Sequence, residues 1–134
     1  MKINNIIVNC MFCVMVILMS LSCKKEPTTK KVTWEYRYEI TGTSGNYDAT
    51  IQNTDNNTQQ WSSVGNGWYY KWTQTLTVDS NDNPIEGQTR WLYVSSQNNN
   101  SSGDVTVKIV RNGKVVASNT SYGGFAIASV DGQY

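Results

Sequence analysis

Histidine is absent from the 134 residues of the sequence. Without it the chain cannot build a Ser-His-Asp or Cys-His nucleophile site, and most kinds of zinc site are excluded. Serines are plentiful, but none lies in a G-x-S-x-G motif. We therefore expect no catalytic residue, no metal ligand and no cofactor, and we predict that the protein is not an enzyme.

Cysteine is scarce, with only Cys10, Cys13 and Cys23. The first two form a C-x-x-C, which is a redox motif in other settings, but here they lie in an apolar run, Ile6–Met19, that follows Lys2. A short basic start, an apolar stretch of about 14 residues and small residues before a cleavage site are typical of a secretory signal. The run is shorter than the roughly 20 apolar residues that a membrane-spanning helix needs. The C-x-x-C is therefore expected to be discarded with the signal.

Leu21-Ser22-Cys23, followed by Lys24-Lys25-Glu26, resembles the lipobox of Bacteroidetes-type lipoproteins, in which the cysteine becomes the lipidated first residue. The resemblance implies a signal peptide over residues 1–22, a lipid on Cys23 and a polar tether over residues 23–31. An uncleaved signal anchor and an ordinary cleaved signal are the alternatives. Several acyl chains make an essentially permanent membrane anchor. Because Lys24 is not a retention signal under the common sorting rule, we expect a cell-envelope protein in the outer rather than the inner membrane.

Net charge is small, +1 over the whole chain. From Val32 onward six basic residues face nine acidic ones, which gives this part a net charge of −3. A mildly acidic domain without a basic stripe argues against a nucleic-acid partner. The part that follows the signal has about 110 residues, enough for one domain with its own core. We place that domain at residues 32–134.

Prolines are few, and apolar and polar residues alternate along much of the domain, as they do in strands with one buried face. In Val32–Thr41 one face carries only Val, Trp, Tyr and Ile, and we expect its Trp34 to lie in the core. Arg90–Ser96 is apolar on both faces, which predicts a central strand covered on each side. Turn signals separate such runs and no stretch has a helical period. The predicted fold class is all-β, an immunoglobulin-like two-sheet β-sandwich of about seven strands.

The strongest local signal lies in Val105–Val130. Asn112-Gly113 stands between two apolar runs, and this dipeptide favours the type I′ turn of a tight hairpin. A third run, Phe125–Val130, follows Gly123-Gly124. We therefore predict a three-stranded antiparallel nucleus in this stretch.

A series of short motifs runs through the domain in a fixed order: YEITG (38–42), TIQN (50–53), TQQW (58–61), VSSQN (94–98), GDVTVKI (103–109), NGKVV (112–116) and GFAIAS (124–129). This ordered set resembles the periplasmic domain of the MmpS-like family, small membrane-anchored accessories to MmpL exporters of lipids and siderophores. The resemblance implies an accessory role beside an envelope transporter. Family members often carry two cysteines at the positions of Val107 and Val130, which implies that these valines are buried neighbours here.

Aromatic residues, Trp91 and Tyr93 among them, exceed what a core of this size must absorb. Residues 68–72, W-Y-Y-K-W, alternate between two faces, so some aromatic surface lies outside whichever face is buried. Exposed rings can stack on sugars or contact a partner protein. The alternative is that these rings only complete the core and cover turns. The candidate ligand- or partner-binding residues are Trp61, Trp68, Tyr69, Tyr70 and Trp72.

Asp79, Asp82 and Glu86 lie in one polar loop. They are the only candidates for a glycosidase-like carboxylate pair, and the loop faintly resembles an oxygen-rich Ca²⁺ loop without its glycine and terminal spacing. Aspartates in such loops usually form turns, and we expect the same of Asn53–Asn57. The favoured function is a non-catalytic, lipid-anchored interaction module that assists an envelope transporter. The alternative is a lipoprotein that binds a glycan or small ligand through exposed Trp and Tyr.

Overall fold

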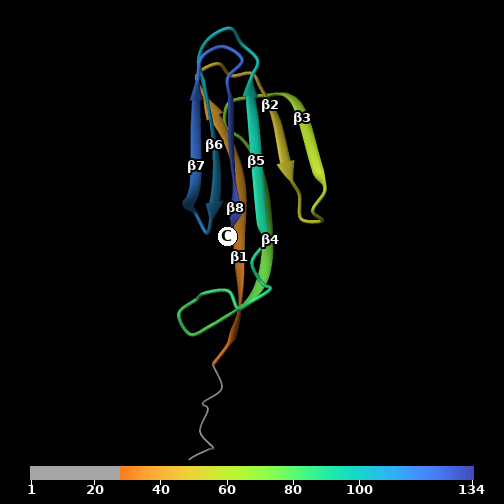
Figure 1. The fold of residues 1–134 in the computed structure, drawn as a ribbon, viewed down its shortest axis with the longest axis vertical. Helices are drawn as coiled ribbons and strands as arrows, with labels where there is room; N and C mark the ends of the chain where they lie inside the picture. The colour runs from red at the N-terminus through yellow and green to blue at the C-terminus, as the bar shows by residue number, and fades with distance from the viewer. Residues whose placement is uncertain (1–27) are drawn as a thin grey trace, which may run out of the picture.

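The computed structural model describes residues 28–134, which form eight β-strands and no helix. The strands make two four-stranded antiparallel sheets packed face to face (Figure 1). The first sheet has the order β4-β1-β6-β7 and the second sheet β3-β2-β5-β8. The strands are β1 (Lys30–Gly42), β2 (Tyr47–Gln52), β3 (Thr58–Val64), β4 (Trp68–Val78), β5 (Trp91–Asn98), β6 (Asp104–Arg111), β7 (Lys114–Tyr122) and β8 (Ile127–Gln133). The predicted all-β sandwich is confirmed.

Strand β1 is the centre of the first sheet and shows the alternation that its sequence predicts. Trp34, Tyr36, Tyr38 and Ile40 are buried in the core between the sheets. The strand begins at Lys30, two residues before the predicted domain boundary, because Lys30 and Lys31 pair with Val78 and Thr77 of β4. The last part of the expected tether is therefore strand.

Strand β5 lies inside the second sheet, but the prediction that it is covered on both sides is wrong. Leu92 and Val94 face the core, whereas Trp91 is 55% exposed and Tyr93 is half-buried on the outer face. No strand among residues 28–134 packs over that face (Figure 1). Two aromatic residues thus lie on the solvent side of a strand that was predicted to be buried on both faces.

The nucleus predicted for Val105–Val130 is only partly right. Strands β6 and β7 form the expected hairpin around Asn112 and Gly113, both of which have positive φ. The third strand, β8, does not join them but pairs with β5 in the second sheet. The β7–β8 connection carries the chain across the sandwich, and Gly123, with φ of 108°, lies at the crossing.

Val107 is fully buried, as the family resemblance implies, and Val130 is only partly buried against the same core. Val130 lies on β8 opposite Val94 of β5, so the two valines belong to different sheets. Burial is thus confirmed for Val107 and in part for Val130, and their being neighbours stays a prediction.

The domain is elongated along β1, which runs from the chain's first described residues to the opposite end (Figure 1). At about 3.3 Å per residue its 13 residues span roughly 43 Å. We call the far end the tip, which consists of the loops at 43–46, 99–103 and 123–126. The near end, with the start of β1 and the β4–β5 loop at 79–90, is called the base.

Candidate functional site

Four of the five predicted aromatic residues pack together on the inner side of β3 and β4. The Trp61 ring lies 5.1 Å from Trp68 and 5.9 Å from Tyr70, and Tyr70 lies 5.9 Å from Trp72. Trp72 in turn stacks on Tyr36 at 5.3 Å. All four are half-buried and pack against the core, so they close the side of the sandwich where β3 and β4 are the edge strands.

This cluster does not have the geometry of a sugar-stacking site. Its neighbouring rings are tilted by 43–51° to one another, whereas a flat sugar platform needs rings with open faces. Tyr69, the fifth predicted residue, points away from the cluster and is 59% exposed. The Arg37 guanidinium lies over its ring at 5.9 Å, and Arg37 also pairs with Glu39 at 2.6 Å. The prediction thus locates a structural cluster and one exposed ring.

The two aspartates of the β4–β5 loop make structural contacts. Asp79 accepts hydrogen bonds from the N–H groups of Asn81 (2.8 Å) and Asn83 (2.9 Å), and these bonds, those from Asn83 first, lower the pKa of its carboxyl. Asp82 forms an ion pair with Lys30 at 2.8 Å. The two aspartates therefore have separate partners. Within residues 28–134 no group of three or more metal-ligating side chains is placed to hold an ion.

Cys23, the predicted lipidation site, lies outside the described residues, as do the signal peptide and most of the tether. Within residues 28–134 there is no helix of a length and apolarity that could cross a membrane. The lipid anchor stays a prediction from the sequence.

The tip is held together by Asn98, a fully buried polar residue at the end of β5. Its Nδ2 donates to the carbonyls of Ser102 (2.9 Å) and Gly123 (3.0 Å), and its Oδ1 accepts from the N–H of Asn100 (3.0 Å). One side chain therefore ties the β5–β6 loop to the β7–β8 loop. Because buried polar groups are costly when unpaired, this arrangement fixes both loops.

Backbone contacts tighten the same junction. The N–H of Gly123 donates to the carbonyl of Gly103 (2.7 Å), and that of Phe125 to the carbonyl of Asn100 (3.0 Å). Gly124 lies so close to the neighbouring loop that a Cβ there would fall 2.3 Å from the Ser101 carbonyl oxygen. Only glycine fits at this position.

Tyr47 holds the third loop of the tip. Its buried hydroxyl accepts from the N–H groups of Ser44 (3.0 Å) and Gly45 (3.1 Å) and donates to the carbonyl of Asp104 (3.4 Å). The Asn100 side chain adds a bond to the Ser44 carbonyl (2.9 Å). All three loops are thus connected by side chains from more than one strand.

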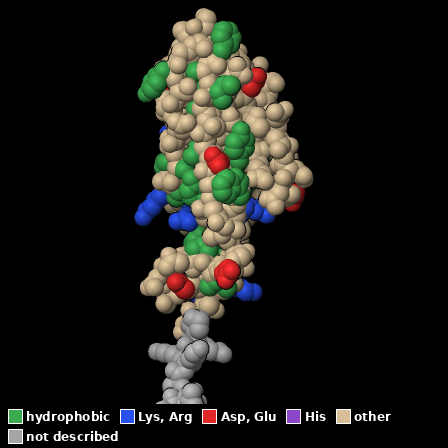
Figure 2. Space-filling view, viewed as in Figure 1, with side chains coloured by type: hydrophobic (Ala, Val, Ile, Leu, Met, Phe, Trp, Pro, Cys, Tyr) green, Lys and Arg blue, Asp and Glu red, His purple; other side chains and the backbone are tan. Residues whose placement is uncertain are grey.

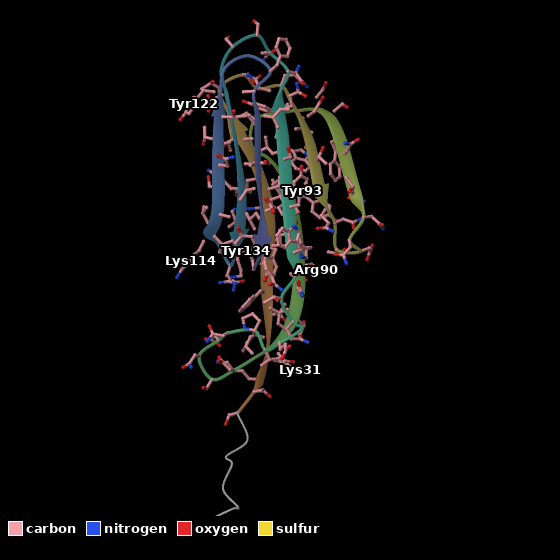
Figure 3. All side chains as sticks on the ribbon, viewed as in Figure 1. Lys31, Arg90, Tyr93, Lys114, Tyr122 and Tyr134 are labelled. Carbon is pink, nitrogen blue, oxygen red and sulfur yellow. The ribbon has the colours of Figure 1, made fainter. Side chains whose placement is uncertain are left out.

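This fixed frame presents apolar side chains to solvent. Tyr122 is 80% exposed and Phe125 61% exposed, and Ile127 is exposed beside them in the sequence. Phe125 has a φ of 58°, a conformation that is a genuine outlier for a bulky residue and costs on the order of 1–3 kcal/mol. Its ring gains little burial in return. Figure 2 shows hydrophobic side chains at this upper end, and Figure 3 places Tyr122 there.

The sequence contained a weak signal for this site. Gly123-Gly124 marked a turn, but nothing in the pattern distinguished Phe125 and Ile127 from core residues of a strand. Comparison with protein-family models and with curated proteins gives no match. The resemblance to the MmpS-like family accordingly rests on the order of the motifs alone.

Proposed function

We propose that the chain is a non-catalytic, lipid-anchored cell-envelope protein that docks onto another envelope protein through its tip. The lipid would be carried by Cys23, and the motif order that resembles the MmpS-like family favours a transporter as the partner. The observation that carries the proposal is Phe125, an exposed aromatic residue that the hydrogen-bonded loops of the tip hold in a strained conformation. Such strain persists only where the surroundings enforce it, and it is concentrated at functional positions.

The chemistry of the tip indicates what kind of surface it would bind. Residues 98–103 and 122–127 contain no charged side chain, and they combine amides and hydroxyls with the exposed rings. Interface centres are depleted in charge and enriched in aromatic residues, with a few of them supplying most of the affinity. A partner surface with an uncharged, apolar pocket fits this description. The tip also lies at the end of the domain opposite the first described residues, facing away from a tether (Figure 1).

The proposal is tested by cross-linking the full-length protein in its own membrane and isolating what is bound. Replacing both Tyr122 and Phe125 by serine removes the exposed rings, and we expect the yield of the cross-linked envelope protein to fall about tenfold or more. Val115→Ser is the control, because Val115 is also an exposed apolar residue but lies outside the tip. Equal recovery of one partner by all three proteins would contradict a docking role for the tip.

The anchor needs a separate test. Cys23→Ala removes the sulfur that would be acylated, so we expect the protein to leave the membrane fraction while its folded domain is unchanged. Metabolic labelling with a fatty acid checks the lipid directly. Retention of label and membrane association by the variant would refute lipidation at Cys23.

A further inference from the structure

The second sheet separates at one point along its length, and a tyrosine from the first sheet fills the gap. The pairing of β2 with β5 ends at Ile51 and Val94. Where the next rung would join Gln52 to Tyr93, the Tyr38 hydroxyl donates to the Gln52 carbonyl (3.1 Å) and accepts from the Tyr93 N–H (3.3 Å). Beyond this bridge the two strands are no longer paired.

A cleft of about 550 Å³ lies beside this separation. Strands β2, β4 and β5 and the loops at 53–57 and 79–90 contribute its walls. Its principal lining side chains are Gln52, Asn56, Gln74, Gln88, Arg90 and Trp91. No aspartate or glutamate lines it, and its size falls within the usual range of small-molecule sites, about 300–1,000 Å³.

Hydrogen bonds hold one wall of the cleft, residues 88–90, in place. The Gln88 side-chain oxygen accepts from the N–H of Thr77 (3.2 Å), and the Thr89 hydroxyl accepts from the Gln133 amide (2.6 Å). The Arg90 carbonyl accepts from the N–H of Tyr134 (3.2 Å). These bonds order this wall without a ligand, which lowers the entropic cost of binding there.

One residue that lines the cleft also carries a buried polar atom that has no hydrogen-bond partner among residues 28–134. Five buried side-chain polar atoms lack a hydrogen-bond partner among the described residues, and two of them, Gln74 Oε1 and Trp72 Nε1, belong to the inner face of β4. Gln74 lines the cleft.

The lining defines the chemistry of the ligand. Side-chain amides both donate and accept hydrogen bonds, as the hydroxyls of a sugar require, and the exposed indole of Trp91 offers a flat apolar face on which a sugar ring stacks. Arg90 forms no ion pair within residues 28–134 and adds a positive charge that suits a carboxylate. We propose that this cleft binds a short saccharide that carries a carboxylate, such as a hexuronate oligosaccharide.

This site differs from the tip in position as well as in chemistry. Arg90 lies in the lower half of the domain and Tyr122 at the upper end (Figure 3). Basic and acidic side chains both lie in that lower half on the face shown in Figure 2. The saccharide proposal therefore stands or falls independently of docking at the tip.

The test uses the full-length protein in detergent and a panel of oligosaccharides that contain uronate or sialate residues, each beside its carboxyl-reduced counterpart. We expect at least one acidic member to bind about tenfold more tightly than its reduced form. Trp91→Ala should weaken that binding at least about tenfold. Arg90→Gln should make the acidic and reduced forms bind alike. Tyr122→Ala, which removes an exposed ring remote from the cleft, should change nothing.

Gln74→Leu provides a second variant that keeps the fold, because it removes a side-chain amide whose oxygen has no hydrogen-bond partner among residues 28–134. We expect it to reduce saccharide affinity about fivefold, with an unchanged or higher midpoint of thermal unfolding. The proposal is overturned if no acidic member of the panel binds, if each acidic member binds no better than its reduced form, or if Trp91→Ala binds as tightly as the unmodified protein.

Discussion

The tip and the cleft expose opposite kinds of side chain to solvent. At the tip, polar groups are turned inward, where Asn98 and Tyr47 bind the loops, and apolar rings are turned outward. At the cleft the rings of Tyr38 and Trp72 pack inward, 4.8 Å apart, and amides line the opening. A rigid, internally bonded frame can hold an apolar side chain in solvent, while a parting of strands leaves polar groups open for a ligand.

The largest loss of stability should come from removing the residue that makes the tip rigid. Asn98→Ala leaves the Ser102 and Gly123 carbonyls and the Asn100 N–H without their buried partner. We expect the free energy of unfolding to fall by about 2–4 kcal/mol. Urea denaturation measures it.

Asn119→Ala is the control for that substitution. Asn119 also donates a side-chain hydrogen bond to a carbonyl, that of Ser129 (2.9 Å), but Asn119 is exposed to solvent. Its loss should cost less than about 1 kcal/mol. If the two variants were equally stable, Asn98 would not be the residue that holds the tip.

A smaller loss of stability should follow from removing the Tyr38 hydroxyl where β2 and β5 separate. Tyr38→Phe leaves the Gln52 carbonyl and the Tyr93 N–H unpaired, and we expect a loss of about 1–2 kcal/mol in the free energy of unfolding. Hydrogen exchange of the Tyr93 amide should accelerate more than that of the Ser95 amide, which lies within the paired part of β5. Equal acceleration at both positions would indicate that the hydroxyl does not bridge the strands.

The same residue gives the domain a pH dependence. Burial raises the pKa of the Tyr38 hydroxyl to about 12, and the hydrogen bond from Tyr93 only partly opposes this. The folded state favours the neutral hydroxyl, and the stability that this hydroxyl contributes is complete below about pH 10. Above that pH the tyrosine of the unfolded chain ionises, and the contribution is lost as the pH rises through about 12. Tyr38→Phe should therefore lose less stability than the unmodified protein between pH 9 and pH 11.5, roughly 1–2 kcal/mol less.

The smallest effect should come from relaxing the strained residue at the tip. Phe125→Gly removes a poorly buried ring from a left-handed conformation that glycine adopts freely, so we expect stability to rise by up to about 1 kcal/mol. Thermal unfolding measures the change, and partner recovery should fall in the same protein. A loss of stability above about 1 kcal/mol would mean that the ring is structural and would weaken the case for docking.

Most of the fold could be predicted because it depends on local alternation. The inward residues of β1 and β2, among them Trp34 and Tyr47, follow directly from period-two patterning, and the β6–β7 hairpin follows from Asn112-Gly113. The cross-over of β8 could not be predicted in this way. Its pairing with β5 depends on contacts between loops far apart in the sequence, such as Asn98 with Gly123.

The sites were harder to predict, for a related reason. An aromatic surplus was evident, but the pattern does not show which rings pack on one another. Trp61 and Trp72 turned inward, whereas Trp91 lies outside on a strand that read as buried on both faces. The cleft lies where β2 and β5 separate, and at that point the hydroxyl of Tyr38 from the other sheet bridges the two strands.

The position of β1 has a mechanical consequence. It pairs with β4 from Lys30 to Ile40 and with β6 from Tyr36 to Gly42, so it is held on both sides over its upper part. Antiparallel hydrogen bonds lie perpendicular to the strands, and a pull on the N-terminal end of β1 would therefore load them together in shear rather than open them one after another. A domain held by its N-terminus and loaded at its tip would thus carry the force along its most extensively paired strand.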